Sequence, residues 1–132
     1  MEKGIQKFKI YKLAERLEIF IYKVTEKFSQ DEKYRSVNQL RRSSSSTTDN
    51  ISEAYHRYHY GDKINRMGIA RGEAGETRDG VIRAYKKGFI SKEVSEFTYE
   101  KYTELIKGIN GYIGYLRNEQ KNHEDKTKEK TN

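Results

Sequence analysis

The sequence predicts an all-α protein, an antiparallel up-down four-helix bundle, on three observations. Four segments repeat apolar or small residues at alternating spacings of three and four, the period that keeps one helix face against packed neighbours. The chain of 132 residues contains no proline. Its 33% hydrophobic and 36% charged residues suit amphipathic helices with wide solvated faces. We expect one domain, a bundle over residues 1–118, followed by a disordered charged tail over 119–132 that holds no apolar residue.

The first predicted helix covers about residues 6–28. Its core stripe steps by three and four through Ile10, Leu13, Leu17, Phe20 and Val24. Ser29 and Glu32 then form an S-x-x-E capping box for the next helix, so the connection is only a few residues long. A short connection makes the first two helices antiparallel neighbours.

The second predicted helix, about residues 31–59, is the one around which the chain is organised. Its inward face is Val37, Leu40, Ser44, Thr47, Ile51, Ala54 and Tyr58. The middle of this face is small and hydroxylated, and such a run is a poor isolated helix because hydroxyl side chains compete for backbone hydrogen bonds. Tertiary packing must therefore hold it, with another helix close by. A flexible Ser-rich linker is the alternative interpretation.

The third predicted helix covers about residues 62–88, with Gly61 as the break and Asp62 as the N-cap. Its stripe is thin: Met67, Ala70, Ala74, Thr77, Val81 and Ala84. Glycines lie in or beside it at positions 68, 72, 75 and 80. Because glycine weakens a helix, we expect close helix approach as the compensation and pair this face with the Ser/Thr face of the second helix. Helix breaks at the glycines are the competing interpretation.

The fourth predicted helix covers about residues 92–118. Gly88 and Phe89 end the helix before it, and Ser91 is its predicted N-cap. Its core stripe consists of large side chains: Tyr102, Leu105, Ile109, Tyr112 and Leu116. Together with the first helix it supplies most of the large apolar side chains of the bundle.

The charge balance favours a polyanionic partner if the cations gather on one surface. There are 27 Lys and Arg against 20 Asp and Glu, a formal charge of +7. Arg35 and Arg42 lie seven residues apart on the second helix, as Arg71 and Arg78 do on the third, and these faces are candidates for one basic surface. With Arg41 they are the predicted nucleic-acid-binding residues. Basicity that serves solubility alone is the alternative.

Aromatic residues at the end of the second helix are the predicted interface residues. Tyr55, His56 and Tyr58 form a mixture able to stack on bases or to cover a subunit interface. Interface burial is the preferred interpretation, because the eleven tyrosines of the chain spread over four helices.

The sequence lacks the residues that several kinds of structural and catalytic site require. The absence of cysteine excludes a disulfide framework and a thiolate metal site. Glu53 and His56 form one E-x-x-H, but a di-iron site needs a second copy and further carboxylates, so we expect neither a metal nor a cofactor. No nucleophile elbow, HExxH or Gly-rich phosphate loop appears, and we expect no enzyme. Without an apolar leader or membrane span, we expect a cytoplasmic location and no membrane contact.

Three motifs carry a family resemblance: QLRR at Gln39 to Arg42, NISEA at Asn50 to Ala54 and IARGEAGE at Ile69 to Glu76. The chain resembles the 23S ribosomal RNA intervening-sequence family of small four-helix-bundle proteins over nearly its whole length to Leu116. That family typically reads Q-L-R-R-A, N-I-A-E-G and I-A-x-G-S-x-x-E. This chain departs from it where Ser44 to Asp49 replace apolar and proline residues and where Ala54 replaces a glycine.

The resemblance implies an up-down bundle that assembles as a ring-like homopentamer. Members are encoded within inserts in bacterial ribosomal RNA genes or elsewhere in the genome. A related branch, the accessory proteins of diversity-generating retroelements, is a basic pentamer that engages a reverse transcriptase and nucleic acid. That branch serves as an analogy only, because a shared fold does not fix function.

Charge, arginine pairs and resemblance together favour a non-enzymatic oligomeric binding protein whose basic surface engages RNA or DNA without strong sequence preference. An oligomeric protein–protein adaptor with no direct nucleic-acid contact is the alternative. A scattered arrangement of Arg35, Arg42, Arg71 and Arg78 favours the adaptor.

Overall fold

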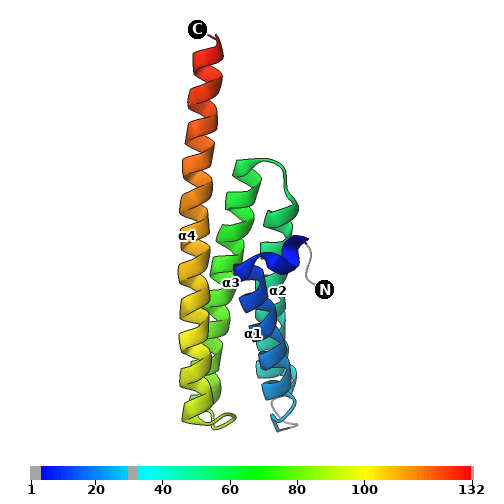
Figure 1. Cartoon of the computed structure of the whole chain (residues 1–132). Coiled ribbons are helices and arrows are strands. Elements are labelled where there is room, and N and C mark those ends of the chain that lie inside the picture. The colour runs from blue at the N-terminus through cyan, green and yellow to red at the C-terminus, as the bar shows by residue number, and fades with distance from the viewer. Residues whose placement is uncertain (1–3, 30–32, 132) are drawn as a thin grey trace.

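Four helices run alternately up and down in this structure, a computed structural model that describes residues 4–29 and 33–131 (Figure 1). The order is a 3-10 turn η1 (Gly4–Lys7), α1 (Lys9–Thr25), a π-helical turn η3 (Lys33–Val37), α2 (Asn38–His56), α3 (Tyr60–Lys86) and α4 (Lys92–Thr131). Each helix packs on the next, and α1 also contacts α4. The predicted antiparallel four-helix bundle is confirmed.

The Ser/Thr run of α2 is helical and mostly buried, so the linker interpretation is wrong. Its hydroxyls bond to the preceding turn of their own helix: Thr47 Oγ1 donates to the Ser43 carbonyl at 2.8 Å, and Thr48 Oγ1 to the Ser44 carbonyl at 3.3 Å. Ser43, Ser44 and Thr47 are each 1% exposed. Hydroxyls satisfied in this way can be buried, because they leave no polar group unpaired.

The small-residue face of α3 packs on this face of α2, as predicted. Thr77 Oγ1 donates a hydrogen bond to Ser43 Oγ at 2.7 Å. A Cβ built on Gly80 would lie 2.7 Å from Leu40 Cδ2, so the two helices approach too closely there for a larger residue. The helix continues through all four glycines, so the competing interpretation of breaks at these residues is wrong. Close approach explains only Gly80, since a Cβ on Gly68, Gly72 or Gly75 would meet nothing within 4 Å.

The turn between α2 and α3 differs from the prediction. His59, with extended backbone, is the N-cap of α3, so Gly61 and Asp62 lie inside its first turn instead of breaking and capping the helix. The physical reason is a capping contact from the next helix. Lys63 Nζ donates to the carbonyls of Ala54 and Tyr55 at 3.0 and 3.1 Å, which satisfies the last turn of α2 and lets that helix end early.

The turn between α3 and α4 follows the prediction. Gly88 has a φ of +82°, a left-handed conformation that favours glycine, just after α3 ends. Ser91 Oγ accepts a hydrogen bond from the backbone N–H of Val94 at 3.1 Å and so caps α4. At the other turn, Glu32 of the predicted capping box and the predicted start of the second helix at residue 31 lie outside the described residues.

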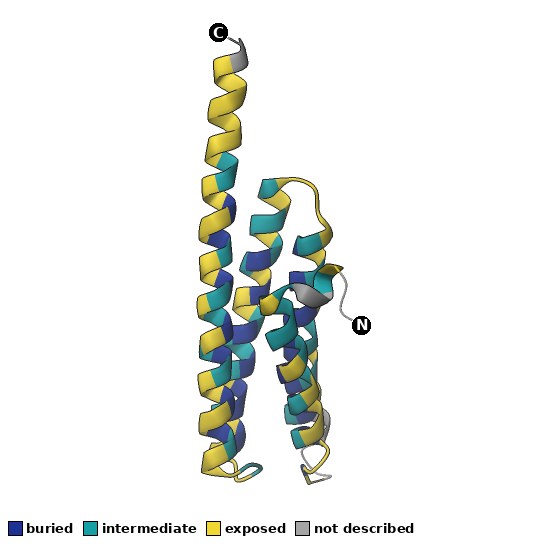
Figure 2. Cartoon of the chain, in the orientation of Figure 1, coloured by how far each residue is buried: buried dark blue, intermediate teal, exposed yellow. Residues whose placement is uncertain are grey.

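The core lies along the inward faces of all four helices, where Figure 2 shows the buried residues. Leu17 of α1 and Ile109 of α4 are 5% and 0% exposed, which confirms them as core positions. The helix α1 is shorter than the others and begins part-way along the bundle (Figure 1). Phe8, just before it, packs its ring on Tyr55 and Tyr112, with centroid distances of 5.7 and 4.8 Å.

The end of α4 continues past the other helices as an exposed helix (Figures 1 and 2). The sequence predicts a disordered tail from residue 119, whereas the structure extends α4 to Thr131. Residues 121–129 are exposed. Helix extension from a packed helix adds a hydrogen bond per residue without a new nucleation cost, and this segment contains no glycine or proline to stop it.

Candidate nucleic-acid interface

Arg42 of α2 is engaged by two carboxylates of α3. Its guanidinium lies 2.8 Å from Glu76 Oε1 and 3.8 Å from Glu73 Oε2. The Arg42 side chain is 60% exposed, so the pair is solvent-screened and contributes little to stability. These carboxylates neutralise much of the charge that Arg42 would offer to a phosphate.

Arg41 is held on the opposite side of α2, against α1. Its Nε donates to Thr25 Oγ1 at 2.9 Å, and a terminal nitrogen donates to the Tyr22 carbonyl at 3.3 Å. The guanidinium also lies over the Tyr22 ring, 4.1 Å from its centroid. Arg41 therefore ties α2 to the end of α1.

Arg71 and Arg78 lie on the side of α3 that faces α4. Arg71 donates to Asn110 Oδ1 at 2.9 Å, and Arg78 donates to Thr103 Oγ1 at 3.3 Å while its guanidinium lies 5.0 Å from the Tyr99 ring centroid. The predicted single basic surface is therefore wrong. Arg71 and Arg78 contact residues of α4, whereas Arg42 contacts Glu73 and Glu76 on another side of α3.

The best candidate site lies beside Arg35, which directly precedes Ser36 in the chain. A cleft between α2 and α3 is lined by Ser36, Gln39, Leu40, Ser43, Glu76, Gly80, Arg83 and Lys87. Lys87 Nζ reaches Ser36 Oγ at 3.5 Å, and Arg83 lies over Gly80. We call Arg35, Arg83 and Lys87 the α2–α3 basic cluster. All three are exposed, and none has a carboxylate partner within the described part of the chain.

The cluster suits a phosphate backbone. Arg83 and Lys87 in the cleft and Arg35 next to Ser36 supply positive charge that no carboxylate of the described residues pairs with, and the Ser36 hydroxyl and the Gln39 amide add neutral hydrogen-bonding groups. Because Glu76 lines the same cleft but is occupied by Arg42, it repels a bound anion less than a free carboxylate would. The geometry can hold phosphates, and it offers no arrangement for reading base edges.

Sequence reasoning missed Arg83 and Lys87. The signal was present, because Gly80, Arg83 and Lys87 follow one another at spacings of three and four on the turn beside the core stripe. The sequence alone did not show that these residues lie beside α2. That became clear only from the structure, in which Thr77 and Gly80 pack against α2.

The predicted interface residues divide into one packed residue and two exposed ones. Tyr55 is half-buried and packs within the chain on Phe8. His56 is exposed, and Tyr58 is 89% exposed in the turn before α3. Burial of Tyr58 in a subunit interface stays a prediction.

Titratable groups with shifted pKa values lie away from the cluster. Partial burial lowers the pKa of Lys63, which caps α2. Burial raises the pKa of Tyr102, and the nearby Glu18 carboxylate adds to the effect. Burial also raises the pKa of Tyr112, with smaller contributions from Tyr115 and Tyr55.

The E-x-x-H pair is taken up by other contacts. Glu53 forms an ion pair with Arg57 at 3.1 Å, and the exposed His56 packs its ring edge-on against Tyr55, with 5.1 Å between the centroids. Among residues 4–29 and 33–131, no group of three or more His, Cys, Asp and Glu side chains could hold a metal ion. No described helix combines the length and the apolar character that crossing a membrane requires.

A family model for the 23S rRNA-intervening sequence protein matches residues 6–111, which cover the four packed helices. The chain belongs to this family. A solved structure from Bacteroides thetaiotaomicron, a protein with unknown function from the S23 ribosomal protein family, has a TM-score of 0.75 at 24% identity, over 80% of this chain and 95% of that one. At that identity it establishes the shared fold. No match was found among curated proteins.

Proposed function

We propose that this 23S rRNA-intervening sequence family member is a non-enzymatic homo-oligomer that contacts the phosphate backbone of RNA or DNA through the α2–α3 basic cluster. The observation that carries the proposal is the cluster itself, in which Arg35, Arg83 and Lys87 lack carboxylate partners among the described residues, while Arg42, two turns after Arg35, is engaged by Glu76. The net charge of +7 supports the same partner class.

Binding of this kind is indifferent to sequence. Lys and Arg contacts to phosphates fix position and supply affinity, whereas sequence is read at base edges. The cluster lies in a shallow cleft between two helices and presents no helix or strand that enters a groove. We propose a cytoplasmic location, where RNA and DNA are accessible to a chain without cysteine.

Assembly strengthens the contact. A homopentamer, the state implied by the family resemblance, repeats the cluster five times, so that several weak phosphate contacts act together on one polyanion. The affinity of a single copy for nucleic acid is then modest, and the affinity of the assembly is much higher.

Retention of labelled RNA and duplex DNA at low salt tests the proposal. The wild type retains both, and the variant Arg35→Gln/Arg83→Gln/Lys87→Gln retains neither well. A matched control, Arg117→Gln/Lys121→Gln/Lys126→Gln, removes the same charge from exposed residues of α4. Equal loss in the two variants would show that net charge alone drives binding.

The protein-adaptor function remains the second candidate, and two observations favour it. Arg42 contacts Glu76, whereas Arg71 and Arg78 contact α4, and this is the scattered arrangement of arginines expected of an adaptor. An apolar groove between α3 and α4 is lined by Ile82, Tyr85 and Tyr99, with Glu96 and Glu100 beside them. The two tyrosines are 42% and 37% exposed. Aromatic side chains exposed in a groove are typical of protein contacts. A wild type that retains neither RNA nor DNA at low salt would favour this function.

A further inference from the structure

The helices α1 and α4 carry stripes of opposite charge. On α1 and the turn after it, cations recur at helical spacing on the side toward α4: Lys9, Lys12, Arg16, Lys23 and Lys27. On α4 the outward stripe is acidic: Glu93, Glu96, Glu100 and Glu104. All four carboxylates are exposed, as are the four cations other than Lys12, which is half-buried.

The two stripes do not neutralise each other within one chain. Lys9, Arg16 and Lys23 make no ion pair among the described residues, nor does Lys27. The acidic stripe pairs only with its own helix, Glu96 with Lys92 at 3.9 Å and Glu104 with Lys101 at 3.4 Å. Lys9, Arg16 and Glu104 line the same groove between the two helices, yet no ion pair joins them among the described residues.

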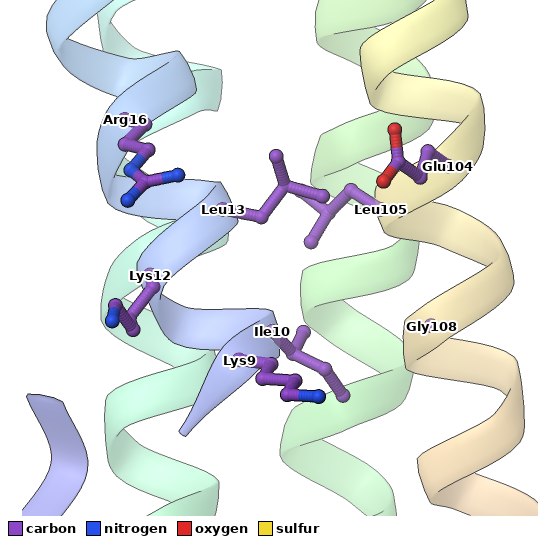
Figure 3. A pocket seen from close by; sticks show the side chains of 8 residues that line it. All are labelled: Lys9, Ile10, Lys12, Leu13, Arg16, Glu104, Leu105 and Gly108. Carbon is purple, nitrogen blue, oxygen red and sulfur yellow. The ribbon is translucent and has the colours of Figure 1, made fainter. Parts of the chain in front are cut away.

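The seam between the helices explains this arrangement. Figure 3 shows Leu13 and Leu105 pointing toward one another across a groove, with Ile10 beside Gly108. A Cβ on Gly108 would lie 3.6 Å from Ile10, so apolar contacts occupy the inside of the seam. Arg16 and Lys12 lie along α1 at the edge of this groove (Figure 3).

Two contacts between α1 and α4 show how far along the bundle axis each charged residue lies. The rings of Phe20 and Phe97 are 5.5 Å apart, and Ile10 lies beside Gly108. Because the two helices are antiparallel, Arg16 lies level with Glu100 and Glu104, and Lys23 lies level with Glu93. The charges thus match in height as well as in sign.

Exposed apolar side chains lie in the middle of both stripes. Ile19 of α1 is 49% exposed, and Phe97 of α4 is 47% exposed, although the latter also packs on Phe20. These two residues lie at nearly the same level. An apolar centre flanked by charges is the usual composition of a protein–protein contact.

From these observations we infer that α1 of one copy docks on α4 of a second copy, with the basic stripe against the acidic stripe and Ile19 against Phe97. The inference rests on the homo-oligomer of the proposed function and names its contact. Any rotation axis parallel to the helices keeps each residue at its own height, so Arg16 of one copy meets Glu100 of the next whether the contact closes as a pair or as a ring. The α2–α3 basic cluster remains outside this contact.

Charge reversal tests the contact most sharply. One variant carries Arg16→Glu and Lys23→Glu, a second carries Glu93→Lys and Glu100→Lys, and a third carries all four changes. A control, Arg117→Glu/Lys121→Glu, makes the same charge change as the first variant on the exposed part of α4. Light scattering gives the mass of each, and circular dichroism confirms that each is folded.

The expected result is a wild type and control at a multiple of 15.6 kDa, with self-association at least about ten-fold weaker in the first and second variants. The four-fold variant, and an equimolar mixture of the first two, should regain the assembled mass because attraction is restored. Folded reversed variants that keep the wild-type mass would overturn the inference, as would a four-fold variant that stays dissociated. A monomeric wild type that still retains RNA would overturn this inference and leave the phosphate contact standing.

Discussion

The hydroxyl of Thr77 on α3 donates a hydrogen bond to the hydroxyl of Ser43 on α2 at 2.7 Å, in a place where both residues are essentially inaccessible to solvent. This contact joins the two small-residue faces of the bundle. A polar bridge here fixes the register of α2 against α3, because a slip of either helix would leave two buried hydroxyls without this partner. The register in turn places Arg83 and Lys87 beside Ser36.

The Ser43 and Thr77 hydroxyls should therefore be energetically coupled. We expect Thr77→Val to cost about 1–3 kcal/mol, because Ser43 keeps only a weak 3.4 Å contact to the Leu40 carbonyl. Ser43→Ala should cost less, since Thr77 still donates to the Glu73 carbonyl at 2.9 Å. Urea unfolding of both single variants and the double variant measures the coupling. Strictly additive losses would mean that the bridge contributes nothing.

Glycines on α3 should respond oppositely to alanine. A Cβ on Gly72 meets nothing within 4 Å, so Gly72→Ala should stabilise the fold by about 0.5–1 kcal/mol through helix propensity. Gly80→Ala places its Cβ 2.7 Å from Leu40 Cδ2 and must displace a buried side chain, which costs about 1–3 kcal/mol. Thermal unfolding ranks the two. Equal effects would show that α2 and α3 can move apart freely.

Tyr102 should make the protein less stable in alkali. Its hydroxyl is buried with no hydrogen-bond partner among the described residues, and burial raises its pKa. Above a pH of about 10 the unfolded chain loses this proton and the folded chain keeps it, so stability falls by up to about 1.4 kcal/mol per pH unit. Tyr102→Phe should remove this loss and leave stability at pH 7 unchanged or higher. An unaltered alkaline slope in the variant would contradict the assignment.

Truncating core side chains of α1 and α4, the helices with the largest apolar side chains, should lower the free energy of unfolding. Leu17→Ala and Ile109→Ala each leave a cavity at a buried position, and we expect losses of about 2–5 kcal/mol. Denaturant unfolding measures them. Ile69→Ala, at an exposed position of α3, is the matched control and should cost far less. A loss below about 0.5 kcal/mol at Leu17 would contradict the packing of α1.

Residues with a helical period were enough to predict the bundle, because each stripe points to the core whatever its neighbour is. The period does not show which side chains of a neighbouring helix a surface residue contacts. The sequence places Arg42 and Arg78 among the predicted nucleic-acid-binding residues, but Glu76 engages the first and Thr103 the second. Such contacts depend on the register between helices. The early end of α2 likewise depends on Lys63, a residue of the next helix.

The most direct test of the central claim is the salt dependence of nucleic-acid binding, measured by fluorescence anisotropy with duplex DNA and a matched RNA. Each phosphate contact contributes about 0.9 to the slope of log affinity against log salt on duplex DNA. We expect Arg35→Gln/Arg83→Gln/Lys87→Gln to flatten the slope by about two to three units. The Arg117→Gln/Lys121→Gln/Lys126→Gln control should keep the wild-type slope, with folding unaffected in both. A wild type that binds neither nucleic acid at low salt, or a cluster variant whose slope equals that of the control, would contradict the account.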